Sequence, residues 1–312
     1  MVKCIVSANR WAKNLPASSG LFILLIRQGE FIMPRQKRYN RKTEDIGNIL
    51  ALEHVNLRVS DQALATTFYV SGLGLTRDPY VDFGTFNVWI NAGAQQFHLP
   101  TGKPQILRGE IGLRVPDLDR LAQRLNRLAP SLNTTRFEAN LDKDSLLVTC
   151  PWGNQIRCFN KGEPELGIPY IELLVEKAKL AGIARFYETI FSVPVKLTAN
   201  RLEVTVGVGQ TLRFKAAGKI PDYDGHHIAI YTPDFSGPYQ LIKSQSHIME
   251  ESNQHQYRFL NIFDPLTGEV LYELEHEVRA LSHPMFNRAL LNRNSNQTFN
   301  QYRKGQDAFY PG

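Results

Sequence analysis

The chain has 312 residues, of which 43% are hydrophobic and 21% are charged. This balance is typical of a packed globular protein and excludes a largely disordered one, and the length predicts two domains rather than one. The three cysteines exclude a disulfide framework and a CxxC-type zinc site, and no apolar stretch is long enough to span a bilayer. We therefore expect a soluble protein in a reducing compartment, the cytoplasm.

The net charge of +6 comes from the N-terminal region, because residues 1–48 hold nine Lys or Arg and only three Asp or Glu. The rest of the chain is balanced, so we interpret residues 1–48 as a basic, disordered leader and expect neither a nucleic-acid nor a membrane partner. The apolar run Leu21–Ile26 faintly resembles an export signal, but it is short and lacks a cleavage pattern. Met33 is an alternative start of translation.

A repeated segment indicates the architecture. His54–Asp61 recurs as Glu110–Asp117, with Leu-Arg-Val-x-Asp in both copies, and again as His227–Asp234. Each copy alternates in character with a period of two, which predicts a β-strand. The Asp that ends each copy is placed to cap the N-terminus of a following helix.

The predicted helices are followed by further strands. A Phe-Tyr pair lies in the helix at Phe68–Tyr69 and again at Phe186–Tyr187, and short β-rich stretches with Gly and Asn come after the first. The chain is therefore predicted to be an α+β protein of four βαβββ units. We place these units at residues 50–102, 108–160, 166–218 and 225–278, with the linker Lys161–Pro164 between the pairs.

This pattern resembles the vicinal-oxygen-chelate superfamily, which includes glyoxalases, fosfomycin- and bleomycin-resistance proteins and extradiol dioxygenases. The resemblance rests on Leu52–Val59, Phe68–Tyr69 and Leu73–Leu75. It implies two tandem glyoxalase-like modules with cup-shaped mixed sheets, at residues 49–160 and 165–278, followed by a C-terminal extension at 279–312. It is specific for the fold and weak for the reaction, because members of one fold carry out many chemistries.

The resemblance also implies which side chains converge, because inward residues on the first and last strands of paired units bind a divalent metal in that superfamily. The positions in the first module are His54, His98, Glu110 and Arg157. Those in the second module are Tyr170 or Glu172, then Arg213, His227 and Glu273. The predicted ligands are thus His54, His98, Glu110, Glu172, His227 and Glu273, and such imidazole and carboxylate sets suit Fe, Mn, Ni or Zn.

Glu110 and Arg157 are the predicted catalytic residues. A guanidinium cannot bind a metal, so Arg157 either faces an anionic group of the substrate or marks a cup without metal. Two other histidines receive structural interpretations. His226 is expected to point away from its neighbour in the strand, and His276 lies in a charged run interpreted as a solvated face at a chain end.

The resemblance implies a metal-dependent enzyme, glyoxalase-like or dioxygenase-like, in which the ion chelates vicinal oxygens of a small substrate. Because Arg157 occupies the position of the expected proton-shuttling carboxylate, isomerase activity is disfavoured. The alternative is a metal-free protein of the same fold that binds or sequesters a small ligand. Metal analysis separates the two, and the sequence leaves open whether a homodimer forms.

Overall fold

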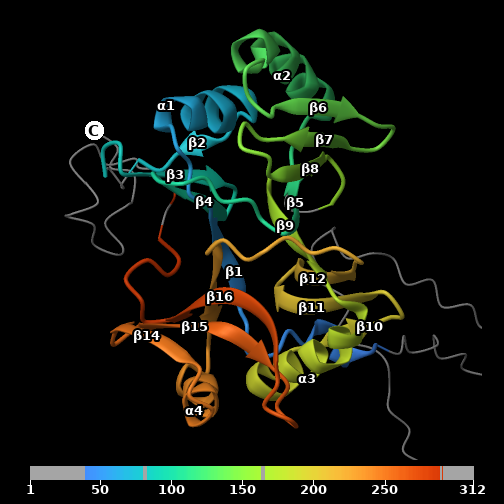
Figure 1. Cartoon of the computed structure of the whole chain (residues 1–312), viewed down its shortest axis with the longest axis vertical. Helices are drawn as coiled ribbons and strands as arrows, with labels where there is room; N and C mark the ends of the chain where they lie inside the picture. Colours follow the sequence, from blue (N-terminus) through green and yellow to red (C-terminus); the bar gives the residue numbers. More distant parts are fainter. Residues whose placement is uncertain (1–38, 80–82, 163–165, 289, 291–312) are drawn as a thin grey trace, which may run out of the picture. The chain divides into compact units, whose positions relative to one another are not determined.

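The computed structural model is built around two eight-stranded mixed sheets (Figure 1). The structure describes residues 39–79, 83–162, 166–288 and 290, so most of the predicted leader and extension, with Leu21–Ile26 and Met33, lie outside the described residues. Residues up to Glu44 form one unit, and the unit that starts at Asp45 contains both sheets. Within the described ranges, every helix is too short or too polar to cross a bilayer.

The element order confirms four βαβββ units. The first comprises β1 (Ala51–Asn56), α1 (Gln62–Ala65) with its continuation η2 (Thr66–Gly72), β2 (Thr76–Arg77), β3 (Asn87–Ala92) and β4 (Gln95–Pro100). The second comprises β5 (Gly109–Arg114), α2 (Leu118–Leu132), β6 (Glu138–Leu141), β7 (Leu146–Thr149) and β8 (Gln155–Phe159).

The remaining elements repeat this order after a short helix η1 (Arg41–Glu44) that precedes all units. The third unit comprises β9 (Gly167–Val175), η3 (Lys177–Lys179), α3 (Leu180–Phe191), β10 (Val195–Leu197), β11 (Arg201–Gly207) and β12 (Gln210–Ala216). The fourth comprises β13 (His227–Thr232), α4 (Ser236–Ser244), β14 (Ile248–Asn253), β15 (Gln256–Phe263) and β16 (Val270–Ala280).

The repeated Asp caps a helix in each of the three copies, as predicted. The side chain of Asp61 accepts a hydrogen bond of 2.9 Å from the backbone N–H of Leu64, and the other two do the same for residues three positions on. Such a cap satisfies one of the N–H groups that the first turn of a helix leaves without a partner. The local sequence therefore determines where each unit turns from strand to helix.

The fold class and the cup-shaped sheets are confirmed, but the units share sheets in other pairs than the expected one with two and three with four. The strand order of the first sheet is β14-β15-β16-β13-β1-β4-β3-β2, so it joins the first unit to the fourth. The second sheet has the order β10-β11-β12-β9-β5-β8-β7-β6 and joins the second unit to the third. Because the first strands of the units carry similar alternating patterns, their local sequence does not determine which edges pair.

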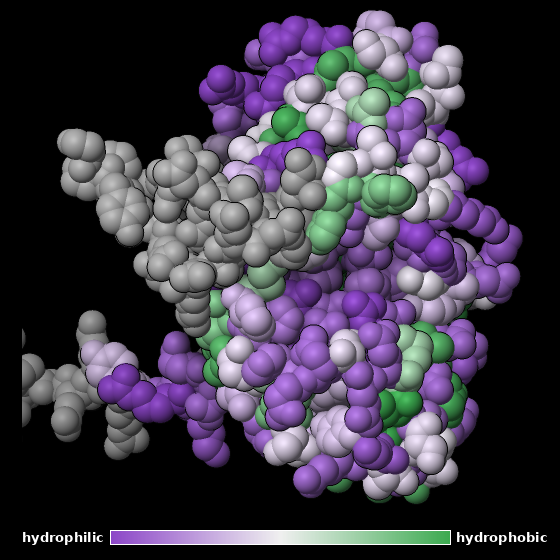
Figure 2. Space-filling view, turned by 90° about the vertical axis from the view of Figure 1, so that its left-hand side faces the viewer, coloured by the Kyte–Doolittle hydropathy of each residue, from purple (hydrophilic) through white to green (hydrophobic). Residues whose placement is uncertain are grey.

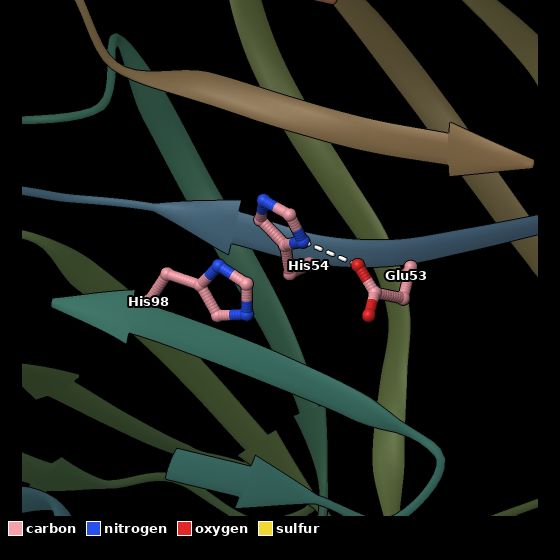
Figure 3. Close-up of side chains that lie close together, drawn as sticks. All are labelled: Glu53, His54 and His98. Atoms are coloured by element: carbon pink, nitrogen blue, oxygen red, sulfur yellow. Dashed lines mark hydrogen bonds and ion pairs between the residues drawn. The ribbon is translucent and has the colours of Figure 1, made fainter. Parts of the chain in front are cut away.

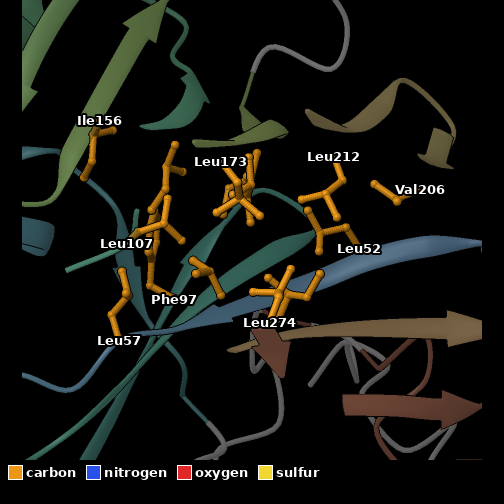
Figure 4. Close-up of a cluster of buried hydrophobic side chains, with 14 of the residues drawn as sticks. Leu52, Leu57, Phe97, Leu107, Ile156, Leu173, Val206, Leu212 and Leu274 are labelled. Carbon is orange, nitrogen blue, oxygen red and sulfur yellow. The ribbon is translucent and has the colours of Figure 1, made fainter. Parts of the chain in front are cut away.

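One hydrophobic core extends across both sheets. Figure 4 shows Leu52 and Leu274, from the first sheet, in the same buried cluster as Leu173 and Leu212 from the second. The side chain of Gln210 joins the sheets further, because it donates to the carbonyl of Leu52 at 2.9 Å and accepts from its N–H at 3.1 Å. The large hydrophobic residues that remain exposed are scattered, and Figure 2 shows a face on which hydrophilic residues predominate.

His276 belongs to this core, so the interpretation of its charged run as a solvated face is wrong. Its strand, β16, lies between β13 and β15. The ring is fully buried and stacks on Phe259 with 4.5 Å between ring centroids. One ring nitrogen donates to the carbonyl of Leu274 at 2.7 Å, and the other accepts from the hydroxyl of Tyr187 at 2.8 Å. The neutral imidazole is therefore fully satisfied without water.

We expect the stability of the protein to fall in acid partly because of His276. Burial lowers the pKa of this residue from 6.5 to about 4. Between these values the unfolded chain binds a proton that the folded chain does not, so the free energy of unfolding falls as the pH falls, by up to about 1.4 kcal/mol per pH unit for one residue. Urea denaturation should show a shallower pH slope for His276→Leu than for the wild type. Equal slopes would contradict this assignment.

Candidate metal centre

A β-bulge in β1 turns two consecutive polar side chains to one face of the first sheet. The register between β1 and β13 shifts between Leu52 and His54, which inserts one extra residue. Leu52 and Val55 are both buried in the core, and the residues between them, Glu53 and His54, leave on the opposite face. Their side chains are hydrogen-bonded to each other through His54 Nδ1, which neighbours in a regular strand could not achieve (Figure 3).

Three histidines gather on this face. His54 comes from β1, His98 from β4 and His227 from β13, and these strands are adjacent in the sheet. The ring centroids of His54 and His98 are 3.6 Å apart, and those of His54 and His227 are 5.7 Å apart. Trp89 of β3 stacks on the other side of His98 at 3.7 Å. We call this face, formed by β1, β4, β13 and β16, the histidine cup.

Strand β16 adds carboxylates to the histidine cup. It runs parallel to β13 and pairs His227 with Glu275, so that Glu275 and Glu277 face the same side. Their oxygens lie 3.6 and 3.7 Å from the two ring nitrogens of His227. The ligand atoms of His54, His227 and Glu277 all lie within 4.8 Å of one another, and all three residues are buried. The predicted ligand Glu273 is exposed instead, two residues before Glu275.

A second group of potential ligands shares His54 with the first. Glu53, His54 and His98 also have ligand atoms within 4.8 Å of one another. However, Nε2 of His98 already lies 3.1 Å from the side-chain oxygen of Gln96, and its ring is held between two other rings. His98 therefore flanks the three residues His54, His227 and Glu277 rather than joining them.

Two arginines hold the carboxylates of the histidine cup. Arg279 donates to Glu53 at 2.9 Å and to Glu277 at 2.6 Å, and Arg258 donates to Glu275 at 2.6 Å and also to Glu277. Desolvation opposes the charged form of Arg279, but the two carboxylates outweigh it and raise its pKa. Three carboxylates and two guanidiniums leave this group of five residues with a formal charge of −1.

The imidazoles of the histidine cup are neutral. Burial, assisted by Arg279, holds the pKa of His54 well below its usual value, and burial with Arg258 lowers the pKa of His227 to about 3. Because a carboxylate only accepts hydrogen bonds, Nδ1 of His54 carries the proton that Glu53 accepts. Nε2 of His54 is then a bare lone pair, and it is buried without a hydrogen-bond partner among the described residues.

The chain beyond β16 packs against the first sheet. This part was predicted to be a surface extension from residue 279, yet Arg279 and Ala280 belong to β16, and Arg288 forms a buried ion pair with Asp78. The side chain of Asn91 donates to the carbonyl of Leu290 at 2.8 Å. The fourth unit therefore extends to Ala280, and the residues that follow, up to Asn287, are half-buried or exposed.

The other predicted residues lie in the second sheet, in a face formed by β5, β8, β9 and β12 that we call the arginine cup. Nε and Nη2 of Arg157 both donate to the carboxylate of Glu110, at 2.8 to 3.0 Å. The hydroxyl of Tyr170 donates to the same carboxylate at 2.7 Å. The guanidinium of Arg213 stacks on Tyr170 at 3.8 Å. Glu172 pairs with Arg201 at 2.7 Å.

The expected combination of Glu110 with His54 and His98 is therefore not formed. Glu110 and Glu172 lie in the arginine cup because units two and three share that sheet, and their carboxylates are bonded to guanidiniums. Neither belongs to a group of three potential metal ligands in the described part of the chain. His226 does not contribute either, since it is buried and its Nδ1 lies 2.7 Å from Asp224.

Sequence reasoning missed five residues of the histidine cup: Glu53, Glu275, Glu277, Arg258 and Arg279. A signal for three of them was present in the alternation of β16, where Glu275, Glu277 and Arg279 take every second position and Leu274, His276 and Val278 take the others. The signal for Glu53 was absent, because a bulge depends on pairing with a distant strand.

No protein-family model matches the sequence, and no curated protein matches it either. Solved structures do share the fold. A putative dioxygenase from Bacillus subtilis is 15% identical with a TM-score of 0.52, and the match covers 81% of this chain and 90% of that one. Glyoxalase I from Zea mays is 12% identical with a TM-score of 0.54, covering 74% of this chain and 92% of that one. The described chain thus shares the fold of these two structures.

Proposed function

We propose that the histidine cup binds one divalent metal ion through His54, His227 and Glu277, and that the protein is a metal-dependent enzyme acting on a small oxygen-rich substrate. The observation that carries this proposal is the buried convergence of two imidazoles and one carboxylate within 4.8 Å. Two histidines and one carboxylate form the ligand set of non-haem iron enzymes with open coordination positions. The fold is shared with a putative dioxygenase and a glyoxalase I, and this similarity also supports a metal-dependent enzyme.

The residues fit a metal ion in three respects. Ligation needs neutral imidazoles, and burial keeps those of His54 and His227 neutral. Glu53 binds the Nδ1–H of His54, which fixes the ring and increases the basicity of Nε2, as a carboxylate commonly does for a metal-bound histidine. The buried lone pair of Nε2 has no partner among the described residues, so a cation would satisfy it. A small shift of the side chains would bring the three ligand atoms to bonding distance.

When bound, the ion would act as a Lewis acid that polarises oxygens of the substrate. Glu275 is the candidate proton carrier, because burial raises its pKa and it lies on the same face of β16 as Glu277. Arg258 holds that carboxylate at 2.6 Å and would stabilise its ionised form after it gives up a proton. Arg279 keeps Glu277 in place. Glu277 would therefore bind the ion while Glu275 moves a proton.

The charge of the cup supports an anionic substrate. The group of Glu53, Glu275, Glu277, Arg258 and Arg279 has a formal charge of −1, and a divalent ion would change it to +1. A monoanionic or enolisable oxygen compound then neutralises a buried excess of positive charge. The sequence argument against isomerase activity no longer holds, because Arg157 lies in the arginine cup and away from these residues.

A metal-free binding protein is the second candidate, and one observation favours it. Both oxygens of Glu277 already accept hydrogen bonds, one from Arg279 and the other from Arg258. In that case the guanidiniums neutralise the carboxylates in place of a metal ion, and the cup recognises its ligand through hydrogen bonds alone.

Metal titration of the full-length protein tests the proposal. The protein is purified, treated with a chelator, dialysed and titrated with Fe(II), Mn(II), Co(II) or Zn(II), and bound metal is measured by elemental analysis. We expect one ion per chain and, for Co(II), visible absorption bands that report nitrogen and oxygen ligands. A folded protein that retains none of these ions would support the metal-free alternative.

A further inference from the structure

A cavity of about 370 Å³ lies outside both cups. It is enclosed by the end of β9, the start of β16 and the connection between β12 and β13, and its walls include Val175, Ile220, Tyr223, Leu271 and Tyr272. This volume is within the range of small-ligand sites. The walls combine apolar and aromatic side chains with charged ones, so the charged groups that reach the cavity determine what it can hold.

Arg108 is the unusual member of this cavity. The residue is only 6% exposed, yet no carboxylate of the described chain lies within 4.0 Å of its guanidinium, as a salt bridge requires. The guanidinium lies 4.1 Å from the ring centroid of Tyr272 and 5.1 Å from that of Tyr223, and it donates to the carbonyl of Glu273. Nε of Arg108 is buried and has no hydrogen-bond partner among the residues that the structure describes.

A buried charge without a counter-ion is unfavourable, and aromatic faces offset only part of the cost. The two tyrosines hold the guanidinium in a defined orientation, and Tyr223 is itself fixed because its hydroxyl donates to the carbonyl of His226 at 2.6 Å and accepts from the N–H of Glu275 at 3.2 Å. A preorganised guanidinium with spare donors is a receptor for a planar anion, which it binds through two parallel hydrogen bonds.

We propose that this cavity is a binding site for a small monocarboxylate with an apolar body. The carboxylate would pair with Arg108, and the apolar part would contact Val175, Ile220 and Leu271. Lys179 provides a second cation at the cavity wall. The acidic residues Glu176, Asp222 and Glu273 also line the cavity and outnumber the two cations, so a multiply charged phosphate is disfavoured.

Calorimetric titration of the full-length protein with benzoate and hexanoate tests this site, with benzamide as the neutral analogue of benzoate. We expect a carboxylate to bind and benzamide to bind at least about tenfold more weakly, because a charge-assisted hydrogen bond contributes that much or more. Arg108→Gln should weaken carboxylate binding by a similar factor. Lys219→Gln, which removes an exposed cation outside the cavity wall, should leave binding unchanged.

Ile220→Trp keeps Arg108 and fills the cavity with a larger side chain. It therefore tests the binding site if Arg108→Gln does not fold. It should weaken carboxylate binding at least as much as we expect for Arg108→Gln. The proposal is overturned if neither carboxylate binds the wild type, if benzamide binds as well as benzoate, or if the folded variants bind like the wild type. In those cases Arg108 only links the two sheets through its hydrogen bond to Glu273.

Discussion

Replacing His227 by alanine is expected to abolish stoichiometric binding of a divalent ion, whereas Glu110→Gln and Glu172→Gln should leave it unchanged. His227 supplies one of only three proposed ligands, and alanine offers no replacement atom. Glu110 and Glu172 were predicted ligands from the sequence but are bonded to arginines in the other sheet. The three variants therefore distinguish two ligand sets. One is the set predicted from the sequence, which includes Glu110 and Glu172, and the other is the set proposed from the structure, which includes His227.

Glu53→Gln provides a graded version of the same test. Glutamine can still accept a hydrogen bond from Nδ1 of His54, but it carries no charge to increase the basicity of Nε2. Loss of a residue that orients a metal-bound histidine typically costs about 10- to 100-fold in metal affinity. Competition with a chelating dye measures these affinities, and circular dichroism checks that each variant folds. Weaker binding by Glu110→Gln but not by His227→Ala would place the ion in the arginine cup and refute the proposal.

Replacing Arg279 by methionine is expected to give the largest loss of stability. Its side chain is 6% exposed and pairs with Glu53 and Glu277, which are themselves largely buried. Removing one partner of a buried ion pair leaves an uncompensated charge and costs about 3–5 kcal/mol. Urea denaturation of the metal-free proteins measures the difference in free energy of unfolding.

Arg201→Met is the matched control for Arg279→Met. Arg201 also pairs with a glutamate, but its side chain is 41% exposed, and Lys215 lies 3.6 Å from the same carboxylate of Glu172. Because the guanidinium of this pair is partly exposed and a second cation lies beside the carboxylate, we expect its loss to cost about 0–1 kcal/mol. Similar losses in the two variants would show that Arg279 does not compensate buried charge. Addition of a divalent ion should restore part of the stability of Arg279→Met, since a cation near Glu277 replaces the lost one.

Much of the fold was predictable because it depends on local sequence. The alternation around His54, Glu110 and His227 indicates strands, and the Asp that follows each of them caps a helix, as predicted. Side-chain period and capping act over a few residues, so they can be recognised without knowledge of the rest of the chain. The assignment of His54, His98 and His227 to inward positions did not follow from these local rules; the resemblance to the superfamily implied it.

The composition of the site depended on contacts between distant segments. Whether His54 meets Glu110 or His227 is determined by which strand pairs with β1, and the sequence allowed either. The register of β16 then selects Glu275 and Glu277 over Glu273, and the bulge in β1 adds Glu53. A shift of one residue in such pairing moves every side chain to the other face, so a local pattern cannot determine it.

The sequence by itself thus determined the four βαβββ units and their helix caps, because these features arise from interactions between near neighbours. Only the tertiary structure decided that units one and four share a sheet, that Arg258 and Arg279 hold the carboxylates beside the proposed ligands, and that Arg108 is buried without a counter-ion in the described part of the chain. The physical reason is that strand pairing and burial of charge are settled by the packing of the whole core, in which residues more than a hundred positions apart become neighbours.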